Sequence, residues 1–112
     1  MALDLNNTKT QVNPNYKKPT KKGTKHDQGK SRLELIVPKW LEDVGHVLAY
    51  GAKIHGDDNW KLVEVKRYHA AIMRHTLAIM SGEYLDPETL KPHAAHIACN
   101  SMFLHYLENP QI

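Results

Sequence analysis

The chain has 112 residues, the size of one small domain. Its net charge of +3 is unevenly distributed: Met1 to Arg32 holds eight lysines and arginines against two acids, whereas Leu33 to Ile112 holds seven against ten. A single cysteine excludes an internal disulfide, and no apolar run approaches the ~20 residues of a transmembrane helix. We therefore expect a soluble, cytoplasmic domain that carries a basic N-terminal arm and has no membrane partner.

Residues 1–25 are rich in Asn, Thr, Lys and Pro and have few apolar side chains. Such a segment cannot bury enough surface to offset the entropy cost of ordering it, so it predicts a flexible basic arm before a domain at 26–112. Lysines in the arm could neutralise the phosphates of a nucleic acid. The segment lacks interleaved aromatic residues and a recognition helix, so a solubilising or interface-covering tail is favoured.

The segment from His26 to Lys30 predicts a turn, in which Gly29 can adopt a positive φ. Apolar residues then alternate at Leu33, Leu35 and Val37, which predicts a short extended or packing segment. Two basic residues here are candidates for contacting a phosphate, although solvent exposure is the commoner role of such side chains: Lys30 and Arg32.

A first helix is predicted from Pro38, which suits the first turn, to a stop at Gly56. Its apolar residues recur at helical spacing: Leu41, Val44, Leu48 and Ala52. A connecting loop with the sequence Asp57-Asp58-Asn59-Trp60 follows. Trp60 could stack on a nucleobase or fill the core at the entry of the next helix.

A second helix is predicted from Leu62 to Ser81, with Gly82 at its C-terminal end. Its apolar stripe predicts a core face and consists of Val63, Ala70, Met73, Leu77 and Met80. Arg67 and Arg74 lie two turns apart, so they could clamp a polyphosphate or pair with the acids of the next loop.

In that loop, Asp86 before a proline predicts a helix cap, whereas Glu83 has no evident local structural role. A third helix is predicted from Pro92 to about Glu108. Polar residues at i, i+3 and i+7 place His93, His96 and Asn100 on one face. Its inward residues are expected to be Ala94, Ile97, Ala98, Ser101 and Leu104.

The fold class is therefore all-α, a small bundle of about three main helices. So thin a bundle leaves apolar faces uncovered, which favours a homo-oligomer. Carboxylate and amide oxygens of Glu83, Asp86 and Asn100 suit Mg²⁺ or Mn²⁺. His93 and His96 suit a softer metal or hydrogen bonds to a phosphate. There is no phosphate-binding P-loop and no nucleophile elbow, so covalent catalysis is not supported.

Several ordered motifs together resemble the N-terminal domain family of phage dATP/dGTP diphosphohydrolases. They are Asp27-x-Gly29-Lys30-x-Arg32, Gly51-Ala52-Lys53-x-x-Gly56-x-x-Asn59-Trp60, Arg74-His75, Gly82-Glu83-x-x-Asp86-Pro87-Glu88 and His93-x-x-His96-x-x-x-Asn100. That family looks related to the all-α, MazG-type nucleoside triphosphate pyrophosphohydrolases. The resemblance covers Lys25 to Leu107. It implies a phage protein in the infected host cell, a helical oligomer and Mg²⁺- or Mn²⁺-dependent cleavage of a purine deoxynucleoside triphosphate to monophosphate and pyrophosphate.

The expected roles follow from the motifs and the resemblance together. The catalytic candidates are Glu83, His93 and His96, and the metal ligands are Glu83, Asp86 and Asn100. The substrate-binding candidates are Lys30, Arg32, Lys53, Asn59, Trp60, Arg67, Arg74 and His75. We expect the acid at position 83 and the polar face of the third helix to meet at one cavity.

Two other functions remain open. The chain lacks the Glu-x-x-Glu of MazG-type enzymes, and its Glu-x-x-Asp lies in a predicted loop, which would suit a phage protein that binds a host defence nucleotide without hydrolysing it. The basic arm would suit an accessory protein that binds nucleic acid.

Overall fold

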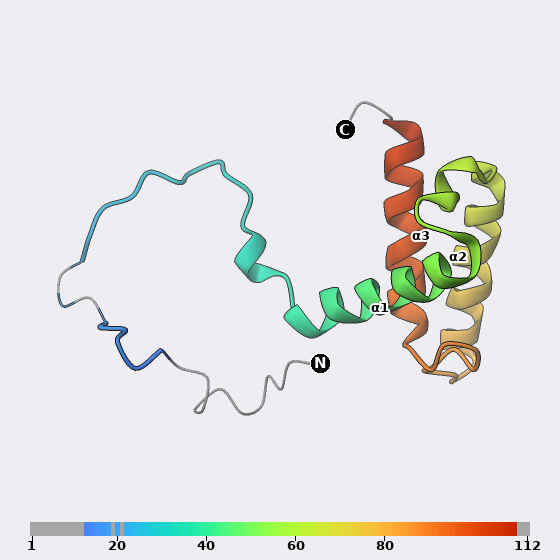
Figure 1. The fold of residues 1–112 in the computed structure, drawn as a ribbon, viewed down its shortest axis with the longest axis horizontal. Coiled ribbons are helices and arrows are strands. Elements are labelled where there is room, and N and C mark those ends of the chain that lie inside the picture. The colour runs from blue at the N-terminus through green and yellow to red at the C-terminus, as the bar shows by residue number, and fades with distance from the viewer. Residues whose placement is uncertain (1–12, 19, 21, 110–112) are drawn as a thin grey trace. The chain divides into compact units, whose positions relative to one another are not determined.

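The computed structural model describes residues 13–18, 20 and 22–109, and the chain divides into two compact units, Met1–Leu35 and Ile36–Ile112. Within the described residues the regular elements are the 3₁₀ helices η2 (Leu33–Leu35) and η3 (Asn59–Leu62) and the helices α1 (Pro38–His55), α2 (Val65–Met80) and α3 (His93–Glu108). In the second unit α2 and α3 run side by side while α1 crosses them (Figure 1). The all-α prediction is confirmed for this part of the chain.

In the first unit, the Lys30 N–H donates to the Asp27 carbonyl at 3.1 Å, and Gly29 has a φ of 80°, so the predicted turn is confirmed. The extended or packing segment predicted from Leu33 is wrong, because Leu33–Leu35 forms η2 and its leucines are exposed. Three alternating apolar residues do not fix an extended backbone when nothing packs against them or completes their hydrogen bonds. The predicted arm falls partly on residues 1–12, 19 and 21, which lie outside the described residues; its described residues are exposed.

The bounds of α1 follow from its two ends. Pro38 occupies the first turn, where its missing N–H costs no intrahelical hydrogen bond. At the other end Gly56 has a φ of 92° and donates its N–H to the Ala52 carbonyl at 2.8 Å. The helix predicted from Pro38 to Gly56 is confirmed, because proline and glycine act locally whatever packs against them.

Helix α2 begins at Val65, later than the predicted Leu62, because Asn59–Leu62 forms η3 first. It ends as predicted: Gly82 has a φ of 96°, and the N–H groups of Gly82 and Glu83 close the last turn at 3.0 Å from the carbonyls of Ile79 and Ala78. Helix α3 begins directly after Pro92 and runs to Glu108, as predicted.

The core lies where α1 meets α3 and consists of Val44, Ala95 and Cys99, with Val47, Leu48, Ala98 and Phe103 packed around it. The core face predicted for α2 is wrong: Met73, Leu77 and Met80 are 65%, 61% and 77% exposed. On α3 the buried small residues are Ala95 and Cys99, whereas Ala94 and Ser101 are exposed. Helical spacing identifies a stripe but not which stripe faces the neighbouring helix.

None of the described helices combines the length and apolarity needed to span a membrane.

Candidate functional site

A pocket of about 860 Å³ lies in the unit Ile36–Ile112 between the second half of α1, the loop with η3, the start of α2 and the middle of α3. Small-molecule pockets span about 300–1,000 Å³, so the space is sufficient for a nucleotide. The apolar lining includes Val47, Leu48, Trp60, Val63, Tyr68, Met102 and Phe103. The polar lining includes Tyr50, His55, Asp57, Asp58, Asn59, Arg67, His96 and Asn100.

Trp60 belongs to an aromatic group at the edge of this pocket. Its ring stacks on Phe103 with centroids 4.7 Å apart and meets the edge of Tyr106 at 5.1 Å. The Lys61 ammonium lies 5.5 Å from the centroid of the Trp60 ring. The Trp60 backbone carbonyl accepts a hydrogen bond from the Tyr68 hydroxyl. The packing interpretation of Trp60 is therefore confirmed. Because the half-buried ring also lines the pocket, its contact with a base stays a prediction.

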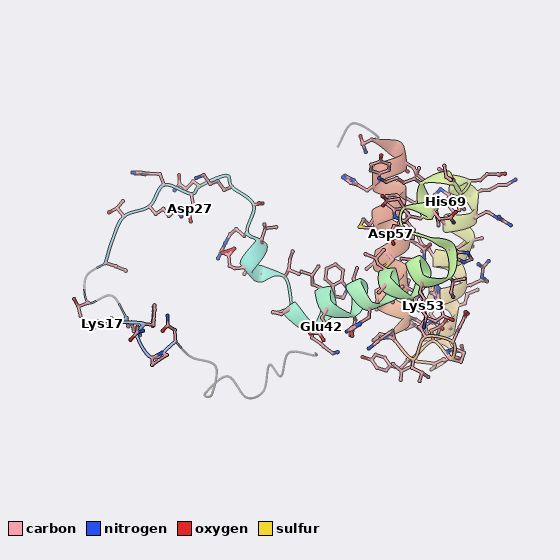
Figure 2. All side chains as sticks on the ribbon, viewed as in Figure 1. Lys17, Asp27, Glu42, Lys53, Asp57 and His69 are labelled. Carbon is pink, nitrogen blue, oxygen red and sulfur yellow. The ribbon has the colours of Figure 1, made fainter. Side chains whose placement is uncertain are left out.

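Two acids of the pocket lining were missed by sequence analysis. Asp57 and Asp58 stand in the loop that follows α1 (Figure 2 labels Asp57), and both are exposed. Asp58 has a left-handed φ of 61° at the start of η3 and pairs with Lys61 at 3.7 Å. The available signal was that two acids stand side by side directly after Gly56, where the helix ends. These acids line the pocket only because α1 crosses α3, and sequence periodicity does not predict that crossing.

A second group, the histidine cluster, joins the end of α2, the following loop and the start of α3. We define it as His75, His93 and His96 with Glu83, Asp86 and Thr89. The Nε2 atom of His93 lies 2.9 Å from Oε1 of Glu83, and its Nδ1 atom lies 2.8 Å from Nδ1 of His75. The ring of His75 also stacks on His96, with centroids 4.6 Å apart and an interplanar angle of 17°.

Thr89 connects His96 to the loop. Nε2 of His96 lies 2.7 Å from the Thr89 hydroxyl oxygen, and that hydroxyl lies 3.4 Å from Oδ1 of Asp86. The same Oδ1 accepts the N–H groups of Glu88 and Thr89 at 2.9 and 3.0 Å. Asp86 therefore caps the turn at 87–89 and not a helix, because α3 begins only at His93, so the helix cap predicted at Asp86 is wrong.

The cluster perturbs three pKa values. Burial lowers the pKa of His75 and of His96, and for His75 the neighbouring imidazoles lower it further. Burial alone would raise the pKa of Asp86, but the two N–H donors from Thr89 and Glu88 outweigh it and hold that pKa below its ordinary value. At neutral pH both imidazoles are thus neutral, so each has one nitrogen lone pair.

The structure brings only part of the predicted site together. Glu83 and His93 contact each other, and His96 reaches Asp86 through Thr89. Asn100 is 7% exposed; its amide donates to the His96 carbonyl at 2.8 Å, one helical turn away. His96 and Asn100 line the pocket, whereas Glu83 and His93 do not. His96 is thus the cluster member that also faces the pocket.

The predicted phosphate-binding residues lie in different places. Asn59 and Arg67 line the pocket. Arg74 lies with Lys66, Arg67 and Ala70 around a second hollow of about 430 Å³ on α2. Lys53 is exposed in the last turn of α1 and does not belong to the pocket lining (Figure 2).

The two remaining phosphate candidates, Lys30 and Arg32, belong to the other compact unit, where Arg32 pairs with Glu34 at 3.6 Å. The alternative role considered for Arg67 and Arg74 was pairing with Glu83 or Asp86. Among the described residues no ion pair joins either arginine to those acids.

Comparison with known proteins identifies the domain. Residues 20–111 match the family described as dATP/dGTP diphosphohydrolase, N-terminal. The chain belongs to this family. A protein of Salmonella phage PMBT28 named dATP/dGTP diphosphohydrolase is 41% identical over 87 residues, which cover 78% of this chain and 30% of that protein. The chain therefore spans less than a third of the relative's length. No solved structure matches it significantly. The region matched by the family, residues 20–111, thus contains every residue of the pocket lining and of the histidine cluster.

Proposed function

We propose that this domain binds a purine deoxynucleoside triphosphate in the pocket and hydrolyses it to monophosphate and pyrophosphate in the cytoplasm of a phage-infected cell. The observation that carries the proposal is the pocket itself: about 860 Å³, with a lining that combines aromatic rings with amide, imidazole, carboxylate and guanidinium groups. The family match over residues 20–111 and the name of the phage relative support the choice of nucleotide.

Arg67 is the residue we assign to the triphosphate. It is the only lysine or arginine in the pocket lining among the described residues, and its side chain forms no ion pair or hydrogen bond with them. A guanidinium presents several donors in a fixed fork that suits phosphate oxygens. Trp60 and Phe103 offer the apolar surface for the base, and Asn59 offers an amide. Arg74, Lys53, Lys30 and Arg32 remain candidates for outer phosphate contacts.

His96 is the residue we assign to proton transfer, with His93 as the alternative from sequence. The Thr89 hydroxyl is oriented toward Asp86, so it accepts from Nε2–H of His96. In the neutral ring this leaves Nδ1 unprotonated and able to accept a proton. Burial keeps the ring neutral by lowering its pKa. Because His96 lines the pocket and His93 does not, His96 is better placed to act on a bound substrate.

A divalent cation, Mg²⁺ or Mn²⁺, remains part of the proposal; when bound it would neutralise phosphate charge and lower the pKa of an attacking water. Glu83, Asp86 and Asn100 were expected to hold it. The donor set partly fits, because Asp86 keeps one carboxylate oxygen, Oδ2, without a hydrogen bond to any described residue. The Asn100 amide instead bonds the His96 carbonyl, and the Glu83 carboxylate bonds His93.

Self-association also remains a proposal. Met73, Leu77 and Met80 form an exposed apolar stripe on α2. Burying a methionine or leucine side chain contributes about 1.5–3 kcal/mol, so a second copy that covers the stripe would stabilise the thin bundle.

The test is a panel of nucleoside triphosphates incubated with the 112-residue chain and Mn²⁺ or Mg²⁺, read by mass spectrometry for bound and hydrolysed species. We expect monophosphate and pyrophosphate from dATP or dGTP. We expect Arg67→Gln to slow turnover about 10-fold or more through weaker substrate binding, with Lys66→Gln as the charge-matched control at the adjacent position.

Intact nucleotide recovered from the protein without product would replace hydrolysis by simple binding. Neither binding nor turnover with any nucleotide would overturn the assignment of the pocket.

A further inference from the structure

Three residues from separate segments bring potential metal-ligand atoms close together. Atoms of His75 on α2, Asp86 in the loop and His93 at the start of α3 all lie within 4.8 Å of one another. We propose that these three side chains bind one divalent transition-metal ion that accepts imidazole nitrogen, such as Mn²⁺, Fe²⁺, Co²⁺ or Zn²⁺. This inference names the ligands of the metal ion that the proposed function requires. Binding of the ion does not depend on the proposed function; only its use in turnover does.

The two imidazoles are spaced as ligands of one ion. Their Nδ1 atoms lie 2.8 Å apart. Two nitrogens at right angles on one ion, with metal–nitrogen distances of ~2.0–2.1 Å, would lie about 2.9 Å apart. The two side chains, which come from separate elements, are therefore close enough to become neighbouring ligands. Ion binding would replace the hydrogen bond between the rings, with the His75 proton moved from Nδ1 and each Nδ1 lone pair turned toward the ion.

Glu83 fixes which nitrogen of His93 faces His75. Its carboxylate accepts a hydrogen bond at 2.9 Å, so Nε2 of His93 carries the proton and Nδ1 has a lone pair. A histidine that binds a metal through one nitrogen commonly donates its other N–H to a carboxylate, which orients the ring and increases its basicity. His93 is 3% exposed, so this orientation is also held by packing. This assigns Glu83 a positioning role beside the metal.

The loop fixes Asp86 as the third ligand. Its backbone N–H donates to the Lys91 carbonyl at 2.8 Å, and its carbonyl accepts the Leu90 N–H at 2.8 Å. Oδ1 is held by the two N–H groups of the turn, so Oδ2 is the oxygen left to bind an ion. The His93 N–H donates to the Tyr84 carbonyl at 3.0 Å, which ties the start of α3 to the same loop. The carboxylate and the imidazole are thus preorganised relative to each other.

The ligand types determine the class of ion. Mg²⁺ prefers oxygen ligands and water, whereas two imidazoles and one carboxylate suit Mn²⁺, Fe²⁺, Co²⁺ or Zn²⁺. Three protein ligands leave further positions for water or a phosphate oxygen. His96 lines the pocket and stacks on His75, so the site is separated from the pocket by one imidazole ring.

The experiment measures binding rather than turnover. Mn²⁺ is titrated into the 112-residue chain, and its affinity is followed by electron paramagnetic resonance, with electron spin-echo modulation to detect coupled ¹⁴N nuclei. We expect ¹⁴N modulation in the wild type and little displacement of Mn²⁺ by equal Mg²⁺. We expect His75→Gln to weaken binding at least 10-fold and Glu83→Gln to weaken it about 10-fold with the ¹⁴N signal retained. The matched control is His69→Gln, an exposed histidine on the same helix.

Circular dichroism checks that each variant is folded. His75 is only half-buried, so His75→Gln decides the question if a substitution of His93 unfolds the domain. Bound Mn²⁺ without ¹⁴N modulation, unchanged affinity in His75→Gln, or no Mn²⁺ binding at all would overturn the site. Mn²⁺ bound with ¹⁴N coupling but without hydrolysis would support the site and contradict only the catalytic part of the proposed function.

Discussion

The pocket and the histidine cluster share His96 but differ in how their polar groups are satisfied. In the cluster the side chains bond one another: Glu83 to His93, His93 to His75, and His96 to Thr89, at 2.7 to 2.9 Å. In the pocket, Asn59 and Arg67 have no side-chain hydrogen bond with any described residue. Other polar groups of the pocket are bonded within the protein: Tyr50 to Glu88, Tyr68 to the Trp60 carbonyl and Asn100 to the His96 carbonyl. The difference indicates that the cluster maintains a fixed geometry, whereas the pocket keeps two side chains, Asn59 and Arg67, whose partners can come from a ligand.

The largest effect that separates the two regions is expected from His93→Ala. This side chain is 3% exposed, so its loss opens a cavity, and it also removes the partner of the half-buried His75, whereas water can replace it at the exposed Glu83 carboxylate. We expect unfolding free energy to fall by about 3 kcal/mol. The pocket counterpart, Asn59→Ala, is expected to cost below about 0.5 kcal/mol. Denaturant unfolding measures both, and equal losses would contradict the comparison.

A slightly smaller effect concerns Cys99, which lines the pocket yet is 2% exposed. Burial raises the pKa of its thiol from 9.0 to about 11. A raised pKa means that the folded state keeps the proton which the unfolded state releases, so this stabilisation is complete below pH 9 and is lost as the pH rises toward 11.

The matched variant Cys99→Ala separates that effect from other groups that titrate in the same range. Between pH 8 and pH 11 we expect the unfolding free energy of the wild type to fall, relative to that of Cys99→Ala, by up to about 2–3 kcal/mol. The wild-type thiol should also react slowly with iodoacetamide at pH 8. A difference independent of pH, or rapid alkylation, would show that water reaches the wall of the pocket at Cys99.

The smallest effect is expected where pocket and loop are joined. The Tyr50 hydroxyl donates to Oε1 of Glu88 at 2.7 Å, and this bond raises the pKa of Tyr50. Tyr50→Phe removes the bond, but water can replace it at Glu88, so we expect only a small loss of stability, less than that of the two preceding variants. Hydrogen exchange of the amides at 86–90 should become faster. Unchanged exchange there would mean that the turn around Asp86 does not depend on the pocket wall.

The sequence was sufficient for the helix ends marked by proline or glycine, but not for the start of α2 or for which face of each helix is buried. Pro38, Gly56, Gly82 and Pro92 determine backbone geometry locally, which is why their predicted positions agree with the structure. The choice between the buried Ala95 and the exposed Ala94 depends instead on which side of α3 meets α1. That crossing is a tertiary property, and both alanines fit a helical stripe equally well.

The site divides in the same way. Glu83, Asp86 and the two histidines of α3 come close because one short loop connects them, so proximity in sequence predicted that part. His75 was assigned to substrate rather than to the cluster, because its contact with His93 depends on the packing of α2 against α3. Asp57 and Asp58 entered the site only through the crossing of α1 over α3.

The most direct test of the central claim is calorimetric titration of the chain with a non-hydrolysable dGTP or dATP analogue. The account predicts one binding event per chain, weakened about 10-fold or more by Arg67→Gln and unchanged by the neighbouring substitution Lys66→Gln. Binding that is equally tight in wild type and Arg67→Gln, or no binding of either analogue, would contradict the assignment of the pocket as the nucleotide site.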